Sequence, residues 1–218
     1  LAAGLTGAAV ALKGSFAAVN WLAWGRLLLG LFLSVAAGFL LARIFWSILP
    51  HDSQSARLFR RLQIPAAAAM SFCHGAQDGQ KFMGVFLLCV TLAQGNQQQA
   101  AFSIPLWLAL LCSFTMAAGT CVGGRRIVHT LGTRLVPLDT AQGFSADLSG
   151  ILCLFGATAL GLPVSTTHTK AAAIWGAGSA VNRHSFNGQV LTQIWSAWLL
   201  TFPCCGMIGY IMTMLLLH

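Results

Sequence analysis

The sequence predicts an all-α membrane protein that crosses the bilayer several times, a polytopic fold with discontinuous helices or re-entrant hairpins. The first observation is composition: of 218 residues, 57% are hydrophobic and 7% are charged. A soluble domain carries about 25% charged residues, so a water-facing surface for this chain is excluded. The high hydrophobicity also excludes a disordered chain. The second observation is a series of apolar runs, and the third is that polar segments interrupt two of them.

The basic residues and the cysteines both have structural explanations. The net charge is +8, but Lys and Arg lie between apolar runs rather than along one helical face, which indicates membrane topology and not nucleic-acid binding. The seven cysteines lie mostly inside apolar runs, without C-x-x-C spacing or a histidine at zinc-site spacing. We therefore expect no disulfide, no metal site and no cofactor.

The first predicted span is the uncharged run 27–42, which lies between Arg26 and Arg43. Tryptophans at both ends are typical of the two membrane interfaces. These tryptophans are Trp21, Trp24 and Trp46. Residues 51–61 are polar and basic, which predicts a loop or a short surface helix.

The region 64–93 predicts one helix that is broken at membrane depth. Its apolar parts, 64–73 and 82–93, are each too short to cross, and residues 74–81 between them read HGAQDGQK. A helix breaks at this depth only where protein or a water-filled cavity meets the free backbone groups.

Asp78 is the candidate functional residue of this first break. An ionisable residue at membrane depth costs roughly 2.5–3.5 kcal/mol and is a functional candidate by default. Among the four acidic residues, Asp78 has this setting most clearly, so we expect it to bind a cation or carry a proton. The alternative is a surface loop between two short buried helices, in which Asp78 is simply paired with Lys81.

The C-terminal part alternates spans and loops around a second break. We expect an uncharged loop at 94–101, a span at 104–121, an arginine-bearing loop at 122–140, apolar halves at 148–162 and 171–181 around a polar break at 163–170, and a last span at 194–217. Hydropathy is compatible with two crossings or with re-entrant hairpins over 144–181.

The second break places Ser165, Thr166 and Thr167 directly before an expected helix start. Hydroxyls and free N–H groups at a helix N-terminus suit a tetrahedral oxyanion, because the positive end of the helix dipole points at it. The alternative is plain N-capping, with Pro163 ending one helix and a hydroxyl capping the next.

Further polar residues lie near these breaks. Gln142, Ser145 and Asp147 can contribute ligands from a hairpin, or can belong to a loop that enters a helix with Ser145 as its cap. His74 and His168 each adjoin a break. Each histidine is either a hydrogen-bonded structural residue or a proton relay.

Charge asymmetry predicts the sidedness. The loops over 43–63 and 122–140 hold seven arginines between them, whereas residues 94–103 hold neither Lys nor Arg. The positive-inside rule places both basic loops in the cytoplasm of a multi-pass protein, expected in the bacterial inner (plasma) membrane.

Two long segments carry a family resemblance. Residues 74–84, HGAQDGQKFMG, resemble the H-G-x-N-D-x-x-K-x-M-G signature of the inorganic phosphate transporter family, and residues 161–169, GLPVSTTHT, resemble its G-x-P-[VI]-S-T-[TS]-H signature. Residues 140–147, TAQGFSAD, also resemble the segment that this family carries between the two. Two departures are Gln77, where Asn is usual, and Asp147, where Glu is common.

The resemblance implies secondary active transport of inorganic phosphate coupled to Na⁺ or H⁺, and no enzymatic activity. The family has two inverted repeats, and this chain resembles the second half of that fold. The implied phosphate ligands are Gln77, Ser165, Thr166 and Thr167, with Gln142 and Ser145 as lesser candidates; the implied coupling-cation ligands are Asp78, Gln77 and Asp147; His74 and His168 remain candidates for a proton relay.

A weak internal echo bears on domain organisation. Lys13-Gly-Ser-Phe16 followed by two tryptophans is similar to Arg183-His-Ser-Phe186 followed by two more, although chance similarity is a serious alternative. We expect residues 1–45 to be the tail of a first repeat with a connecting transmembrane helix, 46–63 to be a cytoplasmic basic loop, and 64–218 to be the second transport repeat. The first-repeat motifs are then expected upstream of Leu1 or on a partner chain.

Other expected partners are membrane lipid and, as a further option, a second copy of the chain in a homodimer, but not nucleic acid. Three rival functions stay open. A sulfate permease of the same fold would take another tetrahedral oxyanion, and a non-transporting half protein would need a partner chain. A membrane phosphotransfer enzyme would use His74, Asp78 and His168, but no nucleophile or metal-ligand spacing supports it.

Overall fold

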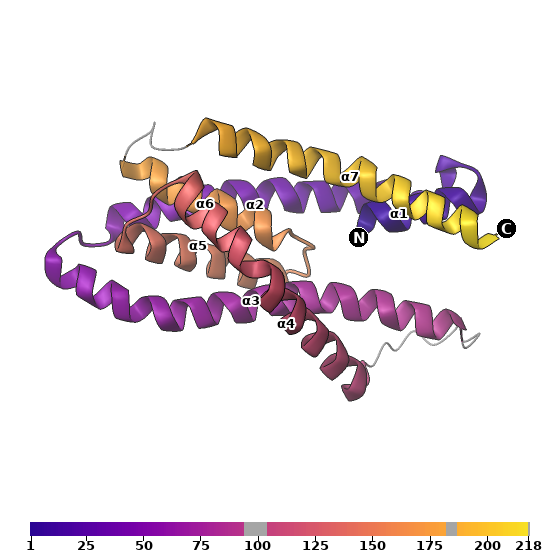
Figure 1. The fold of residues 1–218 in the computed structure, drawn as a ribbon, viewed down its shortest axis with the longest axis horizontal. Helices are drawn as coiled ribbons and strands as arrows, with labels where there is room; N and C mark the ends of the chain where they lie inside the picture. The colour runs from indigo at the N-terminus through magenta and orange to yellow at the C-terminus, as the bar shows by residue number, and fades with distance from the viewer. Residues whose placement is uncertain (94–103, 182–186, 218) are drawn as a thin grey trace. The chain divides into compact units, whose positions relative to one another are not determined.

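The computed structural model describes residues 1–93, 104–181 and 187–217, except for the side chains of 53, 92–93, 125–127 and 133. All regular secondary structure in these ranges is helical, so the all-α class is confirmed (Figure 1). The elements are α1 (Ala2–Lys13), η1 (Phe16–Ala18), α2 (Trp21–Ile48), α3 (Ser53–Ala93), α4 (Leu106–His129), the π-helical η2 (Thr130–Leu135), α5 (Thr140–Ala159), α6 (Thr166–Val181) and α7 (Gly188–Leu217).

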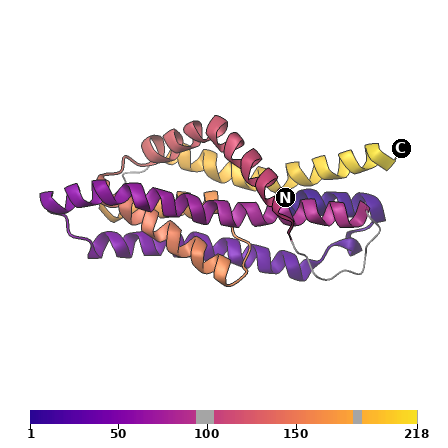
Figure 2. The ribbon, with the colours of Figure 1, turned by 90° about the horizontal axis from the view of Figure 1, so that it is seen from below.

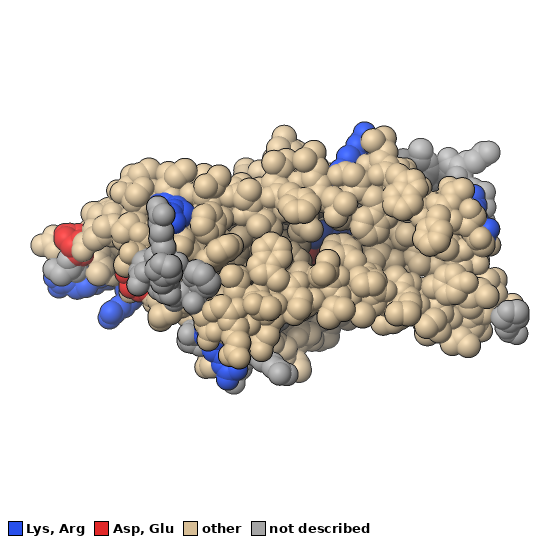
Figure 3. Space-filling model, turned by 90° about the horizontal axis from the view of Figure 1, so that it is seen from above, with Lys and Arg blue, Asp and Glu red and all other residues tan. Residues whose placement is uncertain are grey.

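Three of these helices are long and apolar enough to cross a membrane: α2, residues Leu106–Gly124 of α4, and α7. They coincide with the three predicted spans. Many large apolar side chains on them are exposed, such as Phe32, Phe114 and Leu199. Most of the face drawn in Figure 3 is likewise uncharged. Such a surface suits contact with lipid rather than water.

The chain divides into two compact units. The first contains residues 1–28 and 187–218, and in it α1 packs on α7 through glycines. A Cβ added to Gly7 would lie 1.9 Å from the carbonyl oxygen of Gly206. The backbones therefore approach as closely as only glycine allows. The indole Nε1 of Trp24 donates to Thr6 Oγ1 at 3.0 Å in the same unit.

The second unit, residues 29–186, places a hairpin of α5 and α6 between α2 and α3 (Figure 1). On one side, Phe144 of α5 stacks on Phe59 of α3, with ring centroids 5.2 Å apart. On the other side, Ser149 of α5 donates to the carbonyl oxygen of Gly38 in α2 at 2.8 Å. A small core, which includes Met70, Cys73, Leu154, Ala157 and Val164, fills the space between α3 and the hairpin.

The predicted break in the first signature segment is wrong. Helix α3 runs without interruption from Ser53 to Ala93, as Figure 2 shows. The polar residues of 74–81 do not end the helix because their spacing lets them bond one another along one helix face, as described below. Most of the basic segment that was expected to be a loop over 46–63 also belongs to α3. Residues 49–52 alone separate α2 from α3.

The amino end of α3 is capped by an exposed aspartate. The Ser55 N–H donates to Asp52 Oδ1 at 3.2 Å. Hydrogen bonding from Ser55 lowers the pKa of Asp52 below its ordinary value. This cap explains why the polar start of α3 is helical despite its low hydrophobicity.

The second predicted break is present, but it covers residues 160–165 rather than 163–170, because residues 166–170 belong to α6. Helix α5 ends at Ala159, and α6 begins at Thr166. Gly161 turns the chain with φ at 63°, a left-handed conformation that favours glycine. The segment 144–181 is therefore a helical hairpin. The expected loop at 94–103 and the segment 183–186 of the internal echo lie outside the described residues.

Candidate functional site

The structure brings the two signature segments together. Asp78 lies in α3 and Thr166 is the first residue of α6, and the Thr166 hydroxyl donates to Asp78 Oδ2 at 3.2 Å. The same hydroxyl lies 3.3 Å from His74 Nε2. Thr166 is only 3% exposed. Two segments that are 88 residues apart in the chain thus share one partly buried polar contact.

Asp78 is surrounded by groups that satisfy both of its carboxylate oxygens. Lys81 Nζ lies 2.9 Å from Oδ1, and His74 Nε2 lies 3.1 Å from Oδ2. Both partners are on α3, one turn before and one turn after Asp78. The pairing with Lys81 that the loop alternative required is therefore present, but on a continuous helix. Removing one of these partners would leave the carboxylate partly unpaired, which is costly in apolar surroundings.

Ser165 caps the start of α6, as the N-capping alternative predicts. Ser165 Oγ accepts from the His168 N–H at 3.4 Å, as a helix cap does, and lies 2.5 Å from His168 Nδ1. Thr166 faces α3, as described above. Thr167 is exposed and points to a different face of α6. Thr166 thus contacts Asp78 and His74, whereas the hydroxyl of Ser165 bonds His168.

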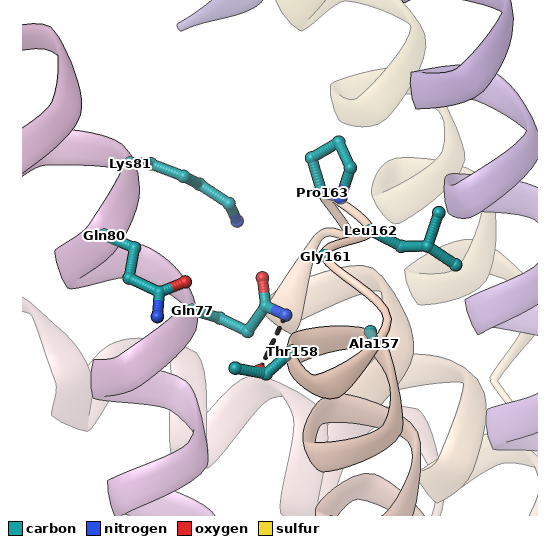
Figure 4. A pocket seen from close by; sticks show the side chains of 8 residues that line it. All are labelled: Gln77, Gln80, Lys81, Ala157, Thr158, Gly161, Leu162 and Pro163. Atoms are coloured by element: carbon teal, nitrogen blue, oxygen red, sulfur yellow. Dashed lines mark hydrogen bonds between the residues drawn. The ribbon is translucent and has the colours of Figure 1, made fainter. Parts of the chain in front are cut away.

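A pocket of about 200 Å³ lies between α3 and the turn of the hairpin. Figure 4 shows its lining side chains, with Gln77 and Lys81 extending from α3 toward the hairpin. Gln77 Nε2 donates to Thr158 Oγ1 at 2.9 Å, and Thr158 donates in turn to the Leu154 carbonyl at 2.8 Å. The lining residues are Gln77, Gln80, Lys81, Ala157, Thr158, Gly161, Leu162 and Pro163. A cationic group, amides and a hydroxyl in a space of this size suit a small oxyanion.

The third polar cluster is not brought to this pocket. Gln142 forms a capping box with Asp139 at the opposite end of α5 from Thr158, about 24 Å away at 1.5 Å per residue. Ser145 is fully buried, and its hydroxyl donates to the Ala141 carbonyl of its own helix at 2.7 Å. In this structure Gln142 stabilises the start of α5, and the Ser145 hydroxyl is satisfied within the same helix.

Asp147 is also engaged elsewhere. Its carboxylate forms an ion pair with Lys170 of α6, which ties the two arms of the hairpin together. This pair is separate from the one at Asp78. The described residues contain no cluster of three or more His, Cys, Asp or Glu side chains that could hold a metal ion.

Sequence reasoning did not single out three of the polar residues at these contacts. Gln80 and Thr158 line the pocket, and Lys170 neutralises Asp147. Thr158 is a single hydroxyl in an apolar run, so the sequence offers no signal for it. Lys170 could have been found as a second buried charge that needs a partner of opposite sign.

A model of the Phosphate transporter family matches residues 48–209. Two relatives are named as probable low-affinity inorganic phosphate transporters. The one from Bacillus subtilis is 36% identical over 95% of this chain and 63% of its own length, and the one from Rhizobium meliloti is 36% identical over 96% of this chain and 64% of its own length.

A solved structure has the same fold. It is titled "The sodium-dependent phosphate transporter" and superimposes with a TM-score of 0.68 at 21% identity, covering 99% of this chain and 64% of that one. The chain thus spans a little less than two thirds of the proteins that it matches. The relatives named here are transporters by name, not enzymes. With three helices that can cross a bilayer, the chain is an integral membrane protein that belongs to the phosphate transporter family.

Proposed function

We propose that this chain forms part of a secondary transporter that moves inorganic phosphate across the membrane together with Na⁺ or H⁺. The observation that carries the proposal is the contact between Asp78 and Thr166, because it unites a cation-suited carboxylate with the start of an anion-suited helix. The names of the relatives support phosphate as the substrate.

In this proposal the two charges are bound side by side. The coupling cation binds Asp78, which offsets the negative charge of phosphate. The phosphate oxygens lie between the first turn of α6 and the pocket over Gln77. Alternating access then follows from the movement of one repeat against the other. The remaining repeat is supplied by chain upstream of Leu1 or by a partner, in line with the fraction of the relatives that is matched.

Phosphate is preferred to sulfate on chemical grounds. Phosphate still carries a proton at pH 7 and can donate it to an acceptor, whereas sulfate cannot. Gln77 lines the pocket with its amide, and Lys81, which also lines it, is bonded to the Asp78 carboxylate at 2.9 Å. A site with a hydrogen-bond acceptor discriminates against a ligand that leaves the acceptor unpaired.

The positions of the arginines indicate which segments of the chain face the cytoplasm. The connection between α2 and α3 and the segment after α4 are proposed to face the cytoplasm. Labelling of a cysteine introduced at residue 51 or 137, in a variant whose seven native cysteines are replaced by alanine, with a membrane-impermeant reagent tests this assignment.

The function is tested by uptake of labelled phosphate into proteoliposomes that contain the protein encoded by the full coding sequence. We expect uptake that a Na⁺ or proton gradient drives and that a hundredfold excess of sulfate leaves largely intact. Thr166→Val, which removes the hydroxyl but keeps the shape, is expected to reduce uptake at least tenfold. Thr167→Val is the matched control, because this neighbouring hydroxyl is exposed. Equal loss in both variants, or full competition by sulfate, would contradict the proposal.

A further inference from the structure

Lys81 takes part in two sites at once. Its ammonium is paired with Asp78 at 2.9 Å, and its side chain also lines the pocket beside Gln77 (Figure 4). A second bond goes to the Val164 carbonyl at 2.6 Å, at the turn of the hairpin. The Lys81 side chain is 29% exposed and that of Asp78 is 23% exposed. The ion pair is therefore partly shielded from water but is open toward the pocket.

A coupling cation at Asp78 would compete with the Lys81 ammonium for the carboxylate. Oδ1 is held by Lys81, and Oδ2 is held by His74 and by the Thr166 hydroxyl. A cation that binds the carboxylate would lie within a few ångströms of the Lys81 ammonium. Two positive charges at this separation repel each other strongly in a partly dry site. Binding of the cation thus favours departure of the ammonium from Asp78.

The pocket offers the ammonium a second destination. Lysine has a flexible four-carbon side chain and a compact charge, so it can exchange partners without movement of the helix. An oxyanion in the pocket would lie next to the amide of Gln77, the hydroxyl of Thr158 and the Lys81 stem. An ammonium that is released from Asp78 meets the oxyanion there and forms a charge-assisted hydrogen bond.

We propose that Lys81 is a phosphate ligand, an inference that rests on the proposed function. Asp78 holds the Lys81 ammonium while the site is empty, and binding of the coupling cation to Asp78 releases it. In this exchange, the cation replaces the ammonium at the carboxylate, and the phosphate replaces the carboxylate at the ammonium. Each ligand thereby strengthens the binding of the other. Thermodynamic linkage requires that this effect be equal in both directions.

Two substitutions separate this role from a merely structural one. Lys81→Gln removes the competitor and the phosphate ligand together. We expect the half-saturating concentration of the coupling cation to fall and that of phosphate to rise, each about tenfold, which corresponds to about 1.4 kcal/mol. Lys81→Arg keeps the charge but pairs more firmly with a carboxylate. We expect it to raise the half-saturating cation concentration while phosphate still binds.

The measurement is initial uptake of labelled phosphate into proteoliposomes as a function of each ligand, with the cation that drives uptake in the unmodified protein. Lys13→Gln is the matched control, because Lys13 is exposed in the last turn of α1, in the other unit. Thermal unfolding of each purified variant checks folding, and the Arg variant provides the test if the Gln variant does not fold.

Opposite shifts for cation and phosphate in Lys81→Gln support the exchange. If the two half-saturating concentrations shift in the same direction, the exchange is overturned. It is also overturned if neither concentration changes in Lys81→Gln, as in the control Lys13→Gln. Uptake by the unmodified protein separates the two proposals. If the unmodified protein takes up no phosphate, the proposed function fails; if it does and the Lys81 variants leave both constants unchanged, only the exchange fails.

Discussion

Substitution of Gly176 by alanine tests how closely α2 and α6 are packed. A Cβ at this position would lie 2.2 Å from the carbonyl oxygen of Phe39 and 2.9 Å from its carbonyl carbon and Cα. All three are backbone atoms of α2, so no side chain can rotate away. Helix α6 must move by about 1 Å to reach an ordinary contact distance. Arg43 opposes this movement, because it donates from α2 to the Ser179 carbonyl and hydroxyl of α6.

The expected cost is at the upper end of what overpacking causes, about 3 kcal/mol. Thermal unfolding of the purified protein in detergent measures it, and phosphate uptake reports the effect on the site, since Thr166 begins the same helix. Gly156→Ala is the matched control in α5, where an added Cβ meets no heavy atom within 4 Å. That variant is expected to be stabilised by about 0.5 kcal/mol, because alanine favours a helix more than glycine does. Equal stability of the two variants would refute the packing argument.

Three further substitutions test other contacts by thermal unfolding. Asp139→Ala removes the capping box of α5 and is expected to cost about 1 kcal/mol; no loss would mean that the cap is not used. Asp147→Asn leaves the Lys170 ammonium without its partner and is expected to cost about 2 kcal/mol. The double variant Asp147→Asn with Lys170→Met should recover part of that loss. Additive losses in the double variant would argue against the ion pair. Trp24→Phe removes one donor and keeps the ring, so a loss of about 1 kcal/mol is expected, and an unchanged midpoint would show that the bond to Thr6 contributes nothing.

The fold class and the second break were predictable because their causes are local. An apolar run without charges indicates a span whatever surrounds it. Pro163 has no backbone N–H and disfavours a helical conformation in the residue before it, and Gly161 adopts a left-handed conformation. The residues of the turn itself thus favour a separation of α5 from α6. The hydroxyl at Thr166 then follows at the next helix start.

The continuity of α3 was not predictable in the same way. Glycines and charged residues in an apolar run suggest an interruption, but helix continuity depends on whether the polar groups find partners. His74 and Lys81 provide partners for Asp78 at helical spacing, and Thr166 provides another from a distant helix. The first two were visible in the sequence. The third required the fold.

In the candidate site, too, some features have local sequence signals and others depend on the fold. Asp78 and Thr166 were singled out by their motifs, but the contact between them spans 88 residues and has no local signature. The pairing of Gln77 with Thr158 across 81 residues has none either. Gln142 and Ser145 were reasonable candidates by residue type. In the structure their hydrogen bonds are made within α5, which a sequence pattern cannot distinguish from ligand binding.

In the proposed function, the Asp78 carboxylate couples a cation to phosphate. The most direct measurement is gradient-driven uptake of labelled phosphate by Asp78→Asn, with Asp52→Asn as the matched control. Asp52 is exposed at the start of α3, and asparagine caps a helix as well as aspartate does. We predict that Asp78→Asn is expressed normally and loses coupled uptake, while Asp52→Asn retains it. Coupled uptake at an unchanged rate in Asp78→Asn would contradict the account.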